Sequence, residues 1–222
     1  MIANILFQDT RFVVLDKPPG LPAHPVRQGG PSLEDCFPHI SRRKDGPWLV
    51  HRLDRDTSGC LLVALRKAAL IAAQAEFAAG RVRKTYWAIV RGGPAQDGGE
   101  ITAPLRRQAE KTAWRMVVDP LGEPASTAWQ VLGRGPGIAW LELRPRSGRT
   151  HQLRVHCASL GFPILGDPIY GDGVGMLHLL ARELELDLAP PVRAIATPAA
   201  HMQPALLQCG WGGIHVMARD AP

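Results

Sequence analysis

The sequence predicts a mixed α/β (α+β) fold built on a largely antiparallel sheet. Short β-branched runs alternate with turn residues, and 23 Gly and 20 Pro account for 43 of 222 residues, which favours many short elements over a helical bundle. Few helical segments are available as crossovers, so neighbouring strands are expected to be antiparallel. Apolar residues make up 45% of the chain and charged residues 21%, proportions typical of a domain with a hydrophobic core.

Strands are expected where short runs of β-branched, aromatic or aliphatic residues lie between turn residues. These runs occupy residues 11–16, 48–50, 60–65, 83–90, 113–118, 126–132 and 138–144. Helices are expected at residues 32–37, 67–79, 150–160 and 176–183. Ser32 suits the N-cap of the first helix, and Gly80 ends the second. Leu153, Cys157 and Leu160 recur at helical spacing and are expected to form the buried stripe of the third.

The whole chain, residues 1–222, is expected to be a single domain, because no repeat or long linker divides it. No run approaches the length of a membrane span and the N-terminus lacks a secretory signal, so a cytoplasmic protein is expected. The four cysteines are far apart and form no CxxC pair, which favours buried thiols over disulfides or zinc. The formal net charge of +6 suits a polyanionic partner, although many plain enzymes are equally basic.

A polar loop at residues 51–59 separates two apolar strands and carries His51, Arg52, Asp54 and Asp56. A loop held by two buried strands is a place where a rigid scaffold displays reactive groups. A surface turn with local ion pairs would use the same residue types. The function of this loop is therefore left open by its composition alone.

Two further segments concentrate positive charge. Residues 144–156 place four arginines and two histidines around the start of an expected helix, where cations oppose the helix dipole but would suit a bound polyanion. A solvated basic face is the alternative. In residues 81–86 three cations precede Tyr86, a weak pattern for nucleic-acid binding through phosphate contacts and base stacking.

Other chemistries find little support. The sequence has no P-loop and no glycine-rich dinucleotide motif. A metal site of His51, Asp54 and Asp56 would include the cations Arg52 and Arg55 between its ligands, which oppose a divalent ion. No metal and no cofactor are therefore expected, and a metal-dependent hydrolase built on those three ligands stays as an alternative.

Four sequence blocks carry a family resemblance. His51-Arg52-Leu53-Asp54-Arg55-Asp56-Thr57-Ser58-Gly59 resembles the HRLDxxTSG signature of RluA-type pseudouridine synthases. KPPGL at 17–21 with HP at 24–25, KTY at 84–86, and SGRTHQLRVH at 147–156 with the glycine-containing segment up to Gly171 resemble other motifs of that family. The blocks follow the family order over about residues 6–171, roughly three quarters of the chain.

The resemblance implies the pseudouridine synthase fold, with an active-site cleft across the sheet, and isomerisation of uridine in rRNA or tRNA to pseudouridine. The target nucleotide would be flipped out of the RNA to expose its glycosidic bond. By the same resemblance Asp54 is the catalytic carboxylate, Tyr86 stacks under the uracil, and Arg154 pairs with Asp54. A guanidinium beside a carboxylate stabilises its ionised form.

Further residues are expected to bind substrate. The resemblance assigns Arg52 to the space left by the extruded nucleotide, where a guanidinium plane can stack on a base. The other substrate-binding candidates are Lys17, Arg83, Arg149 and His151. The expected RNA-binding surface comprises Arg81, Arg83, Arg106, Arg107, Lys111 and residues 144–149. The protein is expected to act as a monomer on RNA; the alternative is an RNA-binding or chaperone-like protein that keeps the fold without the chemistry.

Overall fold

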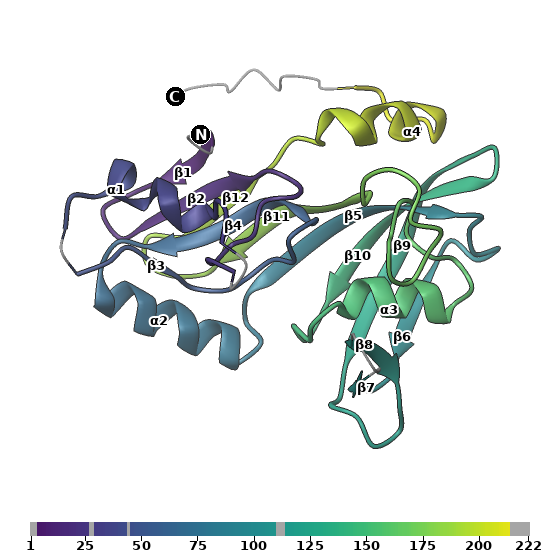
Figure 1. Ribbon diagram of the computed structural model, residues 1–222, viewed down its shortest axis with the longest axis horizontal. Helices are drawn as coiled ribbons and strands as arrows, with labels where there is room; N and C mark the ends of the chain where they lie inside the picture. The colour runs from purple at the N-terminus through teal and green to yellow at the C-terminus, as the bar shows by residue number, and fades with distance from the viewer. Residues whose placement is uncertain (1–3, 27–28, 44, 110–113, 214–222) are drawn as a thin grey trace.

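The computed structural model describes residues 4–26, 29–43, 45–109 and 114–213 (Figure 1). Ten strands form one sheet: β1 (Asn4–Gln8), β2 (Phe12–Lys17), β3 (Trp48–Leu49), β4 (Ser58–Ala64), β5 (Arg83–Arg91), β6 (Gly98–Thr102), β9 (Ser126–Gly135), β10 (Ile138–Pro145), β11 (Leu179–Leu186) and β12 (Val192–Ile195). The order along the sheet is β1-β2-β4-β11-β5-β10-β9-β6, with β12 paired to β11 and β3 to β4. Among the described strands β4 and β11 pair in parallel, and the others pair antiparallel. The expected fold class is confirmed.

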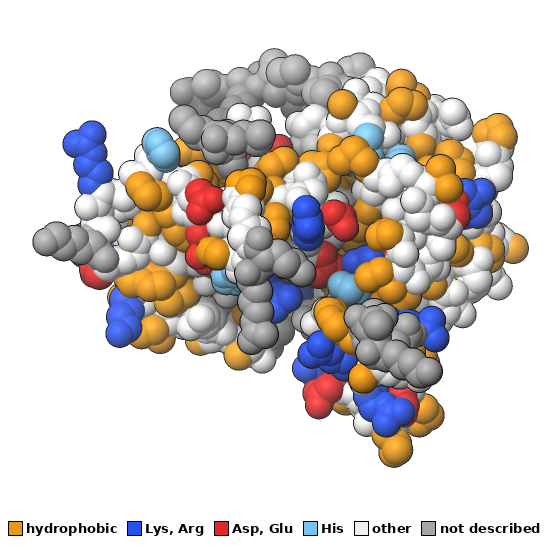
Figure 2. All heavy atoms as spheres, in the orientation of Figure 1, with side chains coloured by type: hydrophobic (Ala, Val, Ile, Leu, Met, Phe, Trp, Pro, Cys, Tyr) orange, Lys and Arg blue, Asp and Glu red, His pale blue; other side chains and the backbone are white. Residues whose placement is uncertain are grey.

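The remaining two strands, β7 (Leu105–Ala109) and β8 (Trp114–Val118), form a separate ribbon that projects beyond the sheet (Figure 1). Lys and Arg side chains gather on this projection, with acidic side chains among them (Figure 2). Because β8 also contacts the helix that follows β10, the ribbon is anchored beside the central part of the sheet.

The described helices are short and few. They are the 3-10 turn η1 (Leu33–Cys36), α1 (Phe37–Ile40), α2 (Lys67–Ala78), α3 (Gln152–Ser159), the 3-10 turn η2 (Ala200–Met202) and α4 (Gln203–Gln208). Figure 1 shows α2 beneath the N-terminal part of the sheet and α3 beside β9 and β10. Leu153 and Cys157 of α3 pack against Ala88 of β5 and Leu141 of β10. The helix that carries Arg154 is thereby held against the sheet.

Strand β2 explains how the sheet forms its core. Phe12 and Val14 face one apolar cluster, whereas Val13 and Leu15 face another on the opposite side. All four side chains are fully buried, because the sheet is covered on both faces in this region. A strand buried on both faces is a continuous apolar run in the sequence, and the run at 11–16 was recognisable for that reason.

The prediction of a helix at residues 176–183 is wrong. Leu179–Leu186 form β11, a central strand between β4 and β5. Leu180 and Leu184 pack into one core cluster, while Leu179 packs into another. Burial on both faces removes the polar-apolar alternation at the start of the strand, and short apolar runs of this kind do not distinguish a strand from a helix.

Smaller differences concern element boundaries. Strands β1, β6, β7 and β12 and helix α4 were not expected, and β9 runs three residues longer than predicted, to Gly135. Helix α3 begins at Gln152 rather than Thr150, because His151 has a left-handed backbone with φ of 52°. Leu160, expected in the buried stripe, lies at the C-cap and is 38% exposed. Residue 113, the first residue of the strand expected at 113–118, lies outside the described residues.

The four cysteines are buried, as expected, and none of them is in a disulfide. No helix in the described parts of the chain is both long and apolar enough to cross a membrane.

Candidate active site

Asp54 lies in the loop between β3 and β4, next to the centre of the sheet. The backbone N–H of Thr57 donates a hydrogen bond of 3.2 Å to the Asp54 carbonyl, and Leu53 is buried in the core. The buried ammonium of Lys17 donates to the carbonyl of Arg55 at 2.7 Å. These contacts fix the loop on both sides of Asp54, whose side chain is 21% exposed.

Arg154 approaches Asp54 from α3. One guanidinium nitrogen, Nη1, lies 3.5 Å from Oδ2 of Asp54, while Nε and Nη2 each donate a 2.7 Å hydrogen bond to Asp167. The Arg154 side chain is only 3% exposed, and that of Asp167 is fully buried. Burial alone would lower the pKa of Arg154, but the hydrogen bonds and charge of Asp167 and the charge of Asp54 raise it on balance.

Asp167 is held as a carboxylate by its partners. Burial raises the pKa of Asp167, but the hydrogen bonds and charge of Arg154 and the backbone N–H groups of Ile169 and Tyr170 lower it overall. Two buried charges that satisfy each other in this way form a rigid support. Arg154 therefore presents its remaining nitrogen to Asp54 from a fixed position.

His151 approaches the same oxygen of the Asp54 carboxylate as Arg154 does. Its Nε2 is 3.9 Å from Oδ2 of Asp54, and its Nδ1 is 2.9 Å from the phenol oxygen of Tyr170. Burial lowers the pKa of His151, opposed by the charge of Asp54. The phenol oxygen of Tyr170 accepts a hydrogen bond from the Met116 N–H, so its own proton is available to Nδ1. With this phenol as the donor, a neutral His151 carries its proton on Nε2, facing Asp54.

Tyr86 projects from β5 into the same pocket. Burial, together with the negative charge of Asp54, raises the pKa of Tyr86 above its ordinary value. Its phenol therefore stays protonated at neutral pH. An aromatic ring with a protonated hydroxyl beside a carboxylate and a guanidinium suits a flat polar ring such as a nucleobase.

The structure brings together six of the eight residues that the sequence proposed for the site. Those that line the pocket are Arg52, Asp54, Tyr86, Arg149, His151 and Arg154. Arg149 is tied to Glu123 at 3.2 Å and to the carbonyl of Pro124 at 3.2 Å. The exposed guanidinium of Arg52 has no hydrogen bond or ion pair with any described residue and stays available to a ligand.

Lys17 does not fit the expected contact with substrate. The residue is fully buried, and its ammonium donates to the carbonyls of Pro18, Leu21 and Arg55 at 2.7–2.8 Å. Burial lowers the pKa of Lys17 to about 8, opposed by the charges of Asp56 and Asp54. Lys17 braces the turn after β2 against the Asp54 loop, so its influence on the site is indirect.

Arg83 does not reach the pocket either. Its guanidinium hydrogen-bonds Glu185 of β11 at 2.7 Å and Asp187 at 2.7 and 3.0 Å. Two carboxylates therefore already neutralise this exposed cation. Lys111, expected on the RNA-binding surface, lies outside the described residues.

His51 and His156 are structural. The Nε2 atom of His51 accepts a 3.0 Å hydrogen bond from the Leu62 N–H, and burial lowers the pKa of His51 to about 3. This ring is occupied by the backbone of β4 and does not converge with Asp54 on a shared ligand. His156 is fully buried between Thr127 and the carbonyl of Ala103. Among the described residues no three His, Cys, Asp or Glu side chains form a metal-binding group.

Three supporting residues were missed from the sequence: Asp167, Tyr170 and Gln152. The buried amide of Gln152 accepts from Ser147 Oγ at 2.8 Å and from the Arg149 N–H at 3.0 Å, which shapes the loop before α3. Asp167 and Tyr170 each lie beside a glycine in the last sequence block. This position was the feature of the sequence that could have identified them as candidate site residues. Their roles depend on side chains from α3, which spacing along the chain does not reveal.

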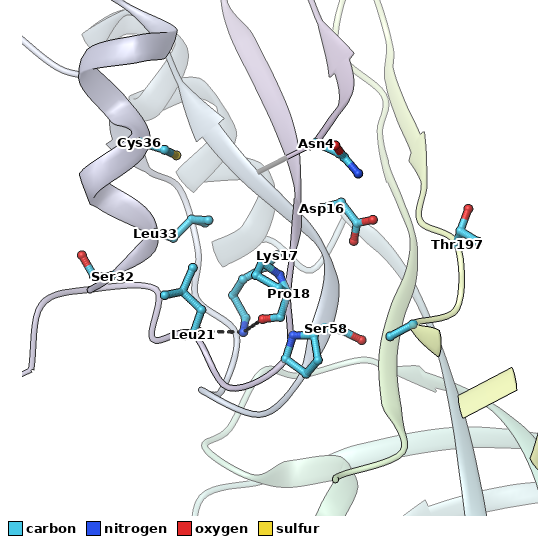
Figure 3. Close-up of a pocket in the computed structure, with 12 residues that line it drawn as sticks. Asn4, Asp16, Lys17, Pro18, Leu21, Ser32, Leu33, Cys36, Ser58 and Thr197 are labelled. Carbon is cyan, nitrogen blue, oxygen red and sulfur yellow. Dashed lines mark hydrogen bonds between the residues drawn. The ribbon is translucent and has the colours of Figure 1, made fainter. Parts of the chain in front are cut away.

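A second cavity of about 250 Å³ lies beyond Lys17, between β2 and η1 (Figure 3). Figure 3 shows Leu21 and Leu33 on the η1 side of the cavity and Asp16 on the other side, with Asn4 and Thr197. Burial raises the pKa of Asp16 to about 6, and no described residue hydrogen-bonds its carboxylate. No arginine lines this cavity, so the carboxylate-guanidinium arrangement of the Asp54 pocket is not repeated there.

Comparison with known proteins agrees with this geometry. Residues 11–159 match the family model described as RNA pseudouridylate synthase. An uncharacterized RNA pseudouridine synthase of Zymomonas mobilis is 43% identical over 194 residues, covering 82% of this chain and 87% of that protein. Ribosomal large subunit pseudouridine synthase D of the same organism is 34% identical over 190 residues, covering 82% of this chain and 60% of its own length.

Solved structures give the same result. The human RNA pseudouridylate synthase domain containing 4 superimposes with a TM-score of 0.78 at 28% identity, and the match covers 93% of each chain. The family model covers two thirds of the chain, and the structural match covers nearly all of it. Both matches include the part of the chain that carries Asp54 and Tyr86. The chain therefore belongs to the RNA pseudouridine synthases, the isomerases that convert uridine in RNA to pseudouridine.

Proposed function

We propose that this chain isomerises uridine in a structured RNA, with Asp54 as the catalytic carboxylate. The observation that carries this proposal is the placement of Asp54, 3.5 Å from Arg154, in a pocket that Tyr86 also lines. The Arg154 guanidinium offers the Asp54 carboxylate a charged donor, and such pairs fix the orientation of a carboxylate. Carboxylates of this kind are used in covalent catalysis at glycosidic carbons.

The proposed reaction requires the target nucleotide outside the base stack. Extrusion costs a few kcal/mol and exposes the bond between N1 of uracil and C1′ of ribose. That bond breaks, the uracil turns within the pocket, and its C5 bonds to C1′. C5 then loses its proton and N1 gains one, so the product is an isomer of uridine. Asp54 assists the cleavage, Arg154 supports its charge, and the ring of Tyr86 holds the detached uracil.

Arg52 and Arg149 supply the phosphate contacts in this proposal. Both line the pocket that holds Asp54, and Arg52 has no carboxylate partner among the described residues. Guanidinium groups bind phosphate bidentately and can also stack on bases. The proposed substrates are rRNA and tRNA, and the relative named for the large ribosomal subunit makes large-subunit rRNA the first RNA to test. Action as a monomer and location in the cytoplasm are parts of the same proposal.

The test is tritium release from rRNA and tRNA transcripts labelled at C5 of uridine. Wild-type protein should release tritium, and Asp54→Asn should release none while it still binds the RNA. Asp56→Asn is the matched control, because it removes a neighbouring carboxylate that does not line the pocket. Release that survives in Asp54→Asn would overturn the assignment. Binding without release from any transcript would favour the RNA-binding alternative.

A further inference from the structure

A second concave surface adjoins the Asp54 pocket. It is a groove of about 480 Å³ between the β7–β8 ribbon and the loop before α3. Its charged and aromatic lining residues are Arg52, Arg106, Arg107, Trp114, Glu123 and Arg149. Because Arg52 and Arg149 line both hollows, the groove continues directly from the Asp54 pocket. Its volume lies within the range of small-molecule binding sites, about 300–1,000 Å³.

Arg107, Trp114 and His151 are stacked in a column beside this groove. The guanidinium carbon of Arg107 lies 4.5 Å from the centre of the Trp114 indole. The imidazole of His151 stacks on the same indole with the ring centres 5.2 Å apart and the planes at 22°. Trp114 nevertheless leaves 37% of its surface exposed. Large aromatic side chains with exposed surface beside arginine are typical of platforms on which nucleobases stack.

The charges along the groove favour an anionic ligand. Arg149 is paired with Glu123 and Arg106 with Asp119, so both are partly neutralised. Arg52 has no ion pair with a described residue, and it lies where the groove meets the Asp54 pocket. A cation at this junction, next to a stacking platform, matches the phosphate and base of a single nucleotide.

We propose that this groove binds the nucleotide next to the target uridine. The base of that nucleotide packs against the exposed surface of Arg107 and Trp114, and its phosphate contacts Arg52 and Arg149. The proposal rests on the proposed function, because it takes an RNA with an extruded uridine as the ligand. It adds a contact to a base outside the reaction centre, so Trp114 is a residue that positions the substrate.

His151 connects this subsite to the reaction centre. The same imidazole that stacks on Trp114 places its Nε2 3.9 Å from the Asp54 carboxylate. A base bound against Trp114 therefore lies one side chain away from Asp54. This proximity is the reason for assigning the groove to an adjacent nucleotide rather than to a distant part of the RNA.

The experiment is a binding cycle between protein and RNA. The probe is a fluorescein-labelled RNA stem–loop with one uridine at the centre of its loop, and two versions lack the base on the 5′ or the 3′ side of that uridine. Fluorescence anisotropy measures the Kd of each RNA for wild type and Trp114→Ala. Loss of one stacked base should weaken wild-type binding about 5- to 150-fold. Trp114→Ala should bind the intact RNA about as weakly as wild type binds the RNA that lacks the base. Removing that base should not weaken the binding of Trp114→Ala any further.

Matched variants separate stacking from disturbed folding. Trp114→Phe should restore most of the affinity, because it keeps an aromatic face, and Arg107→Ala should show a smaller loss that depends on the same base. Leu121→Ala removes an exposed apolar residue of the same groove outside the column, and it should keep the full effect of the missing base. Thermal unfolding of each variant measures its stability.

Three outcomes would overturn the subsite. The first two are that wild type does not bind the stem–loop, and that removing either neighbouring base leaves its Kd unchanged. The third is that Trp114→Ala and the missing base weaken binding independently, so that their combined effect on Kd is the product of the two separate effects. If Trp114→Ala does not fold, the cycle with Arg107→Ala decides between these outcomes. Binding is measured without turnover. If wild type releases no tritium but the binding losses are coupled, the proposed function is contradicted and the subsite stands. If wild type releases tritium but the binding losses are not coupled, the subsite is contradicted and the proposed function stands.

Discussion

Asp167 accepts two hydrogen bonds of 2.7 Å from Arg154, one on each carboxylate oxygen, whereas Asp54 lies 3.5 Å from the guanidinium nitrogen that remains. The stronger partner of Arg154 is therefore the buried aspartate outside the pocket. This division holds the guanidinium in place while leaving the oxygens of Asp54 accessible. The position of Asp54 relative to its cation is thus set by a residue that does not line the Asp54 pocket.

Asp167→Ala should impair both stability and activity. It leaves the Arg154 charge buried without its main partner, and breaking a buried ion pair in this way costs about 3–5 kcal/mol. We expect the free energy of unfolding to fall by that amount in urea titration, and kcat for tritium release to fall by at least about tenfold because Arg154 is no longer positioned.

The double variant Asp167→Ala/Arg154→Met is the control for this prediction. Removing both charges should recover much of the stability lost in Asp167→Ala, since no charge is left buried alone. Activity should stay low. Recovery of activity together with stability would show that Arg154 is not needed beside Asp54.

Lys17→Met tests whether Lys17 is a brace or a substrate ligand. The substitution leaves the carbonyls of Pro18, Leu21 and Arg55 without their donor, and an unsatisfied buried carbonyl costs about 1–3 kcal/mol. We expect a loss of about 3 kcal/mol in unfolding free energy and a lower kcat, with the Kd for RNA changed less than about twofold. A large rise in Kd in protein that is still folded would restore Lys17 as an RNA ligand.

Arg52 and Arg83 should differ in their contribution to RNA binding. Arg52 has no carboxylate partner among the described residues, so Arg52→Ala should weaken binding and reduce the slope of log Kd against log salt by about 1. Arg83→Ala should change neither quantity appreciably, because Glu185 and Asp187 already neutralise that guanidinium. Anisotropy titrations at several salt concentrations provide the measurement. Equal effects of the two substitutions would contradict the assignment.

Asp16 should make stability depend on pH. Burial raises its pKa to about 6 from 3.8, so between about pH 4 and pH 6 the folded state retains a proton that the unfolded state has lost. Its contribution to stability therefore decreases as pH rises through this window. Two pKa units correspond to at most about 3 kcal/mol, and we expect about 1 kcal/mol because Asp16 is only half-buried. Asp16→Asn should raise the melting temperature at pH 7.5 and have less effect at pH 4.

Asp9→Asn provides the opposite control. Burial raises the pKa of Asp9, but hydrogen bonds from Arg11 and Phe12 lower it on balance. Its contribution to stability is therefore present above pH 4 and lost on acidification. Asp9→Asn should lower the melting temperature at pH 7.5. The same sign of change in both variants would contradict the environments described for these two carboxylates.

Part of the fold and most of the candidate site could be predicted from local sequence. The strand at 11–16 and the helix at 67–79 were recognisable because each has a continuous pattern of its own. Strand β11 was not, because its environment is supplied by β4 and β5 from distant parts of the chain. The resemblance of the loop at 51–59 led to Asp54, whose pocket also contains Tyr86 and Arg154.

The sequence by itself determined the fold class, the family and the residue types that meet around Asp54, because these depend on periodicity and on motifs of contiguous residues. Only the tertiary structure decided how each charge is used. Lys17, Arg83 and Arg154 are all basic residues within or beside a motif, yet one binds three carbonyls, one binds two surface carboxylates, and one links Asp54 to Asp167. The role of a charged side chain depends on its partners in space, and those partners lie up to 104 positions away along the chain.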